Sequence, residues 1–206
     1  MGSKKMLYIF TAPSKVFEDV KDEWDWVDWI FPILIIILAS ILSSYLLLPS
    51  LIIPQQIEKT KNNQELSQEK RESRLGYLNS SFHYISSYFS RIGNQIIYYL
   101  IMSFLLLVVV IPFGGKSVDY GNTFTAVIHV GLIKSVGMVA DSLLKYYTHS
   151  LDTGFNLAAV FSGGYGYLHY FFKTINLFSL CHVILFSIML KVFYDYSKEK
   201  AIFIMF

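Results

Sequence analysis

Two long uncharged hydrophobic runs dominate the pattern of the chain. Residues 29–48 and 92–113 each hold about twenty positions without a charged side chain. An α-helix of that length can cross the hydrocarbon core of a bilayer. Two further stretches, 124–147 and 175–193, have helical length and are mainly apolar. The pattern therefore predicts an all-α, polytopic integral membrane helix bundle with four to five spans.

Shorter amphipathic segments flank these spans. In residues 13–28 apolar positions recur at three- and four-residue steps between charged ones, which predicts a helix along the membrane surface. A similar pattern at 75–91 predicts a second interfacial helix that leads into the second span. Trp24, Trp26 and Trp29 cluster where the charged segment meets the first span, as is typical of interfacial anchors.

A polar segment at residues 55–74 separates the first two spans. It is rich in Lys, Glu, Gln and Asn, so it must lie in water, and its composition suits either a solvated helix or a partly disordered loop. Pro49 and Pro54 precede it and predict that the first span ends there. The chain thus divides into an amphipathic N-terminal segment, 1–28, and a membrane domain, 29–206.

Two segments near the end of the sequence allow more than one interpretation. Residues 155–172 carry no charge, but Gly163, Gly164 and Gly166 interrupt them, so a short or re-entrant helix is as good a prediction as a span. The apolar run 201–206 cannot cross a bilayer by itself. It is either an interfacial tail or part of a fifth span.

Composition and charge agree with a membrane protein and exclude a nucleic-acid binder. Hydrophobic residues make up 54% of the chain and charged residues only 16%. The net charge is +2 and the cations are scattered, so no basic face is available for a phosphate backbone. The cations also divide almost evenly between the two predicted sides of the membrane, so they do not determine the orientation.

The third span carries the best candidate site. Lys134, Asp141 and Lys145 are spaced seven and four residues apart, which places them within a stripe of about 40° on one helix face. Charges in a span usually face the bundle interior or a wet cavity. The stripe could be a polar path for a substrate, a lipid headgroup or a proton. Alternatively, and in our view preferably, Lys145 snorkels while Asp141 pairs with one of the lysines.

No motif indicates catalysis. The five histidines form no i, i+4 pair and no HExxH motif. The run Gly115-Lys116-Ser117 lacks the first glycine of a phosphate loop, because Val110 occupies that position. No serine lies in a GxSxG motif. We therefore expect no enzymatic activity, no cofactor and no metal site.

Three segments in succession resemble the Yip family, the Ypt/Rab-interacting membrane proteins, and specifically its bacterial branch. They are a Pro-Ser-x-x-Phe helix at 13–17 before the first span, a glycine turn at 114–116 before Tyr-Gly-Asn-Thr-Phe at 120–124, and Asn-Leu-Phe-Ser at 176–179 followed by Ser-Lys-Glu-Lys-Ala at 197–201. Asn176 stands where an Asp is common in the family, and Cys181 where a Trp is usual.

The resemblance implies a five-helix bundle with a cytoplasmic N-terminus and no catalytic residues. Eukaryotic relatives are associated with Rab GTPases and vesicle traffic, and some bacterial relatives appear alongside ABC-type export systems. We therefore expect an accessory or assembly partner of a membrane complex, such as an ABC-type exporter, in the bacterial inner (plasma) membrane. Residues 13–28, 55–74 and 75–91 are the expected contact surfaces. The alternative is a small transporter or lipid-handling protein that uses the polar stripe.

Overall fold

The computed structural model describes residues 2–22, 25–110, 119–159 and 166–205, and every regular element in these ranges is helical. The α-helices are α1 (Gly2–Thr11), α2 (Pro13–Asp22), α3 (Trp26–Leu47), α4 (Ile53–Asn62), α5 (Gln68–Leu78), α6 (Ser81–Val110), α7 (Tyr120–Thr148), α8 (Tyr167–Thr174), α9 (Leu177–Tyr194) and α10 (Lys198–Met205). A π-helical turn, η1 (Leu48–Ile52), and a 3₁₀ turn, η2 (Leu157–Ala159), complete the list.

The predicted all-α membrane bundle is confirmed. Within the described ranges four helices are long and apolar enough to cross a membrane: Trp26–Asn62, Ser81–Val110, Tyr120–Thr148 and Leu177–Tyr194. Each corresponds to one of the predicted spans. Trp24, the predicted turn at 114–116 and the glycines Gly163 and Gly164 lie outside the described residues.

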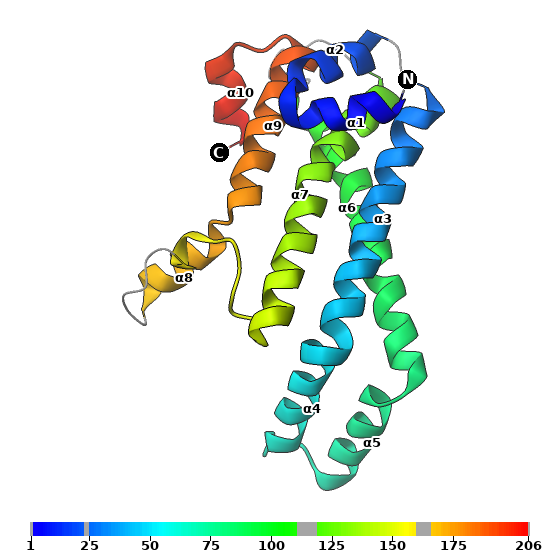
Figure 1. Cartoon of the computed structure of the whole chain (residues 1–206), viewed down its shortest axis with the longest axis vertical. Helices are drawn as coiled ribbons and strands as arrows, with labels where there is room; N and C mark the ends of the chain where they lie inside the picture. The colour runs from blue at the N-terminus through cyan, green and yellow to red at the C-terminus, as the bar shows by residue number, and fades with distance from the viewer. Residues whose placement is uncertain (1, 23–24, 111–118, 160–165, 206) are drawn as a thin grey trace.

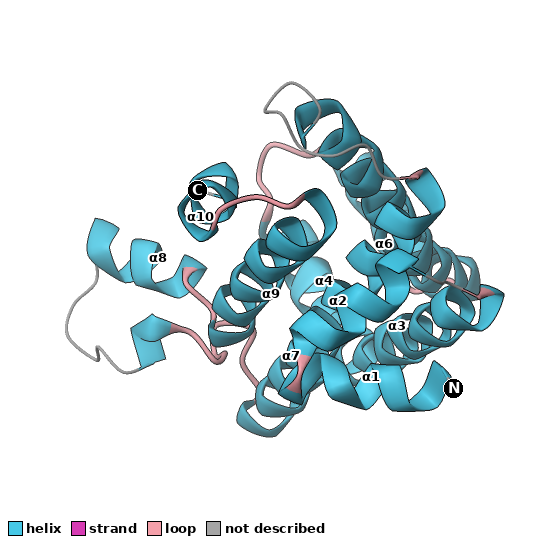
Figure 2. Cartoon of the chain, turned by 90° about the horizontal axis from the view of Figure 1, so that it is seen from above, coloured by secondary structure: helices cyan, strands magenta, loops and turns pink. Residues whose placement is uncertain are grey.

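Helix α7 lies at the centre of the bundle, between α3 on one side and α9 on the other (Figures 1 and 2). Its middle section, residues 126–132, is completely buried. Two glycines let neighbouring helices approach closely. A Cβ atom on Gly131 would lie 2.6 Å from the Tyr99 ring of α6, and one on Gly137 would lie 2.5 Å from the Phe178 Cβ of α9. The small residues therefore set the helix spacing.

The N-terminal helices α1 and α2 cover one end of the bundle (Figure 1). Helix α2 begins at Pro13, where the missing N–H costs nothing, but it ends at Asp22 because Asp25 starts α3 with a capping box. Its apolar residues are fully buried, and Phe17 meets Phe193 of α9 edge-on with ring centroids 6.2 Å apart. The apolar stripe thus contacts protein rather than lipid. Its placement at the membrane surface stays a prediction.

Pro49 and Pro54 do not end the helix, although the prediction for the first span implied that they would. The helix continues through η1 into α4, giving one helical run of 37 residues. A proline in an α-helix lacks the N–H donor and its ring clashes with the carbonyl four residues earlier. The wider π-helical turn at Leu48–Ile52 relieves that clash, and the Ser50 hydroxyl donates to the Leu46 carbonyl oxygen.

The prediction of a separate interfacial helix at 75–91 is also wrong. Residues 75–78 end α5, Asn79 and Ser80 form a turn, and α6 then runs unbroken for 30 residues from Ser81. The amphipathic pattern belongs to the first part of a spanning helix. Polar positions on that part therefore face other helices as well as water.

The polar segment 55–74 forms a helical hairpin, α4–α5, so the solvated helix was the correct alternative. The run from Trp26 to Asn62 is about 55 Å long at 1.5 Å per residue, whereas the hydrocarbon core is about 30 Å thick. The hairpin therefore extends beyond the bilayer, at the end opposite α1 and α2 (Figure 1). The Arg71 guanidinium closes it by donating to the carbonyl oxygens of Asn63 and Leu66.

The last part of the chain holds one span and two short helices. Within residues 155–172 the described portion contains η2 and the start of α8, which agrees with a short helix rather than a span. Helix α10 packs on α9, with Ala201 buried between them. Beside it the Tyr196 hydroxyl donates to the Val110 carbonyl oxygen at 2.6 Å, joining this end of the chain to α6.

We expect Gly137→Ala to destabilise the bundle by about 1–3 kcal/mol, because the added methyl would overlap the Phe178 Cβ, which the α9 backbone holds in place. Thermal unfolding in detergent measures the effect. Gly93→Ala is the matched control, since nothing lies within 4 Å of its added Cβ. Equal melting temperatures for the two variants would contradict the close α7–α9 packing.

Candidate functional site

A polar region lies between the spanning helices. One cavity, of about 410 Å³, is lined by α3, α6 and α7, and a second, of about 340 Å³, by these helices and the start of α9. They share Arg91, Lys134 and Met138 as lining residues, so we treat them as one site, the polar cavity. The other polar residues of the cavity are Ser40, Ser43, Ser44, Asn94, Gln95, Tyr98, Asp141, Ser142, Lys145, Asn176 and Ser179.

Helical periodicity brings these side chains together. On α6, Arg91, Asn94, Gln95 and Tyr98 are separated by successive steps of three, one and three residues, so they lie on one helix face. On α3 the serines at 40 and 44 are one turn apart. On α7 the predicted stripe forms the third wall. Three helices therefore each turn a polar face toward the same space.

The structure brings all three residues of the predicted stripe to this cavity. Lys134 lines both parts, whereas Asp141 and Lys145 line the second part only. Lys134 lies halfway along α7, so it is the deepest charge in the span. Its ammonium group donates to the Tyr98 hydroxyl at 3.4 Å and lies 4.5 Å from the centre of the Tyr98 ring.

Asp141 has a different partner from the one we expected. Its two carboxylate oxygens accept hydrogen bonds at 2.9 Å from the backbone N–H of Phe155 and from the Asn176 side-chain amide. Among the described residues no lysine is within ion-pair distance of it. Asn176 also caps α9, because its side-chain oxygen accepts from the Phe178 N–H at 2.8 Å. Asp141 thus fastens the α7–α9 connection to α7.

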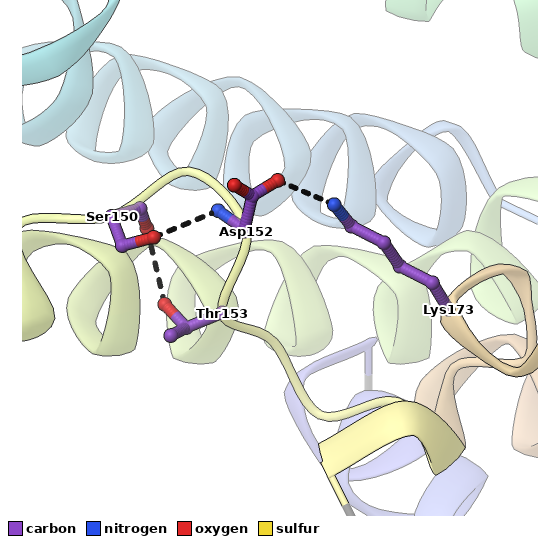
Figure 3. A network of polar contacts seen from close by, with 4 residues as sticks. All are labelled: Ser150, Asp152, Thr153 and Lys173. Carbon is purple, nitrogen blue, oxygen red and sulfur yellow. Dashed lines mark hydrogen bonds and ion pairs between the residues drawn. The ribbon is translucent and has the colours of Figure 1, made fainter. Parts of the chain in front are cut away.

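The connection that Asp141 holds is braced at a second point, shown in Figure 3. The Asp152 N–H donates to the Ser150 hydroxyl at 3.2 Å, and Thr153 donates to the Ser150 carbonyl oxygen at 3.1 Å. The Asp152 carboxylate pairs with Lys173 of α8. Backbone bonds from the Leu157 N–H to the Ile175 carbonyl oxygen and from the Leu177 N–H to the Phe155 carbonyl oxygen hold the connection against the start of α9.

Trp26 and Trp29, the described residues of the predicted aromatic cluster, do not line the polar cavity. Trp26 is 60% exposed at the first turn of α3. Trp29 is partly buried and packs against the core. Their role as interfacial anchors stays a prediction.

The comparisons with known proteins identify the family. The chain matches the Yip1 domain over residues 7–206, nearly its whole length. It belongs to the Yip1 domain family. No curated protein and no solved structure matches the sequence.

Sequence reasoning missed the α6 wall of the Yip1 cavity. Arg91, Asn94, Gln95 and Tyr98 recur at helical steps, so a signal was present. Arg91 is the last residue of the predicted interfacial helix 75–91, whereas the other three lie within the predicted second span 92–113, so the prediction divides the four residues between two elements. The unbroken α6 unites them on one wall.

We expect Asp141→Asn to destabilise the Yip1 bundle by about 1–3 kcal/mol, because one acceptor oxygen becomes an NH₂ group that faces an N–H donor. Thermal unfolding in detergent checks this. Asp152→Asn is the control and should have little effect, since its pair with Lys173 is largely exposed. A normal melting temperature for Asp141→Asn would show that the carboxylate does not hold the connection.

Proposed function

We propose that this Yip1 domain protein is a non-enzymatic accessory or assembly partner of a membrane complex, and that the α4–α5 hairpin is its docking element. The observation that supports the proposal is the hairpin itself. The helical run from α3 through α4 continues about 20–25 Å past a 30 Å hydrocarbon core, and α5 returns beside α4. An ordered helical projection into water offers a surface to a partner.

The hairpin surface suits protein contacts. Helix α5 begins with an N-cap, since the Ser67 hydroxyl accepts from the Lys70 N–H, and Arg71 ties the loop to the helix. Its exposed charges are of both signs: Glu58, Lys59, Lys61, Glu65, Glu69, Lys70, Glu72 and Arg74. A rigid surface with alternating charges favours specific pairing with a complementary partner.

Exposed apolar side chains lie beside the hairpin at the start of α6. Phe82 is 70% exposed and Phe89 72%, with Ile85 between them at 57%. These three residues share one face, at three- and four-residue steps. Of the three segments expected to make contacts, the hairpin and this part of α6 therefore remain available. The apolar side of α2 is buried against α9 and α7.

The class of complex is a further part of the proposal. The resemblance to bacterial relatives favours an ABC-type exporter in the inner membrane as the complex to examine first. Absence of catalytic function belongs to the same proposal, because the polar cavity holds no nucleophile with an adjacent base and, within the described residues, no cluster of metal-ligating side chains.

The test is purification of the tagged full-length protein in mild detergent, with quantitative mass spectrometry of co-purifying proteins. Reversing two exposed charges on α5, Lys70→Glu with Arg74→Glu, should reduce a stoichiometric partner at least about tenfold, since like charges would then face its docking surface.

The control is Lys198→Glu, which changes an exposed charge at the far end of the molecule and should leave the partner bound. A photo-crosslinker at position 70 identifies the contacting subunit directly. An unchanged complex in the α5 variant, with no crosslink from the hairpin, would reject the hairpin as the docking element.

A further inference from the structure

The polar cavity holds more positive charge than its acidic residue can balance. Arg91, Lys134 and Lys145 line it, with Asp141 as the carboxylate. Both Asp141 oxygens already accept from uncharged donors, and Arg91, whose side chain is exposed, has no hydrogen-bond or ion-pair partner among the described residues. Charges inside a bilayer are normally paired. An anion from outside the chain would supply the missing partner.

A buried hydroxyl gives a second, independent observation. Ser43 is only 2% exposed and lines the cavity, yet its Oγ has no hydrogen-bond partner in the described structure. A serine in a helix usually bonds to the carbonyl four residues earlier, as Ser40 does to Ile36. Ser43 instead keeps a hydroxyl free for a ligand. Asn94 and Gln95 add amide groups to the other part of the cavity.

The depth of the cavity matches a lipid headgroup. Helix α9 spans 18 residues, about 27 Å, so its N-cap Asn176 marks the membrane boundary opposite α1 and α2. Asn176 and Asp141 form the outer end of the cavity, and Lys134 lies two helical turns deeper, about 10 Å along α7. The cations therefore extend from the headgroup level into the hydrocarbon layer.

Apolar surfaces beside the cavity suit acyl chains. On α3, Ile41 and Tyr45 are 40% and 68% exposed next to the lining serines. On α6, Ile97 and Ile101 are 53% and 52% exposed next to Tyr98. A ligand with a charged head and long apolar chains fits this combination, whereas a soluble anion would use only the polar part.

We propose that the polar cavity binds the phosphate of an anionic phospholipid, with Arg91 and Lys134 as its main cationic contacts and Ser43 as a hydrogen-bond donor. Arg and Lys are the side chains that proteins use most for phosphate groups. The lipid tails lie along the exposed faces of α3 and α6. This inference does not depend on the hairpin being a docking element.

The experiment is native mass spectrometry of the delipidated full-length protein with added phosphatidylglycerol. We expect binding at least about tenfold tighter than that of diacylglycerol with the same acyl chains, because the phosphate makes charge-assisted hydrogen bonds that the neutral lipid lacks. Equal binding of the two lipids would overturn the proposal. Inorganic phosphate that competes fully with the lipid at equal concentration would show a soluble-anion site and overturn the lipid assignment.

Variants of the cavity lysines test whether the lipid binds in the cavity. Lys134→Met should weaken phosphatidylglycerol binding at least about tenfold, and Lys134→Arg should retain it. Lys191→Met is the matched control, since it removes an exposed cation from the opposite end of α9. The same loss in Lys134→Met and Lys191→Met would overturn the proposal. If Lys134→Met does not fold, Lys145→Met provides the same comparison from the outer part of the cavity.

Discussion

The close contact of α7 with its neighbours determines the rest of this bundle. Helices α6 and α9 approach α7 at Gly131 and Gly137, where a single methyl group would overlap the facing side chains. In a bilayer such packing is a main source of helix association, because lipid chains are as apolar as the helices themselves. Helices α3 and α6 contact α7 more than they contact each other. The space left between them is the polar cavity.

Asp141, a half-buried carboxylate, affects both the fold and the charge of the cavity. By accepting from the backbone at Phe155 and from Asn176, it fastens an irregular connection to the bundle and supports the N-cap of α9. Those donors satisfy it without either lysine of α7. Lys134 and Lys145 are thereby left to face the cavity. Asp141 therefore stabilises the α7–α9 connection and leaves the lysines of the cavity available.

The four predicted spans follow from the length of the hydrophobic runs. The shared face of Lys134, Asp141 and Lys145 follows from the helical repeat of 3.6 residues per turn. The predictions that failed concern features that depend on contacts between helices or on an irregular turn. The helix continues beyond Pro49 because a π-helical turn removes the steric clash, and no local sequence pattern predicts such a turn. The sequence pattern of α2 is the same for an apolar stripe that contacts lipid and for one that contacts Phe193 of α9.

The helical run that supplies one arm of the hairpin also supplies one wall of the cavity. Residues 26–62 make one continuous helix that carries Ser40 and Ser44 near its middle and the projection at its far end. Helix α6 likewise joins Phe82, at its water-side end, to Arg91 and Gln95. The π-helical turn at Leu48–Ile52 lies between the two α3 serines and the projection. A partner bound to the hairpin would therefore be joined to the α3 wall of the cavity through this one turn.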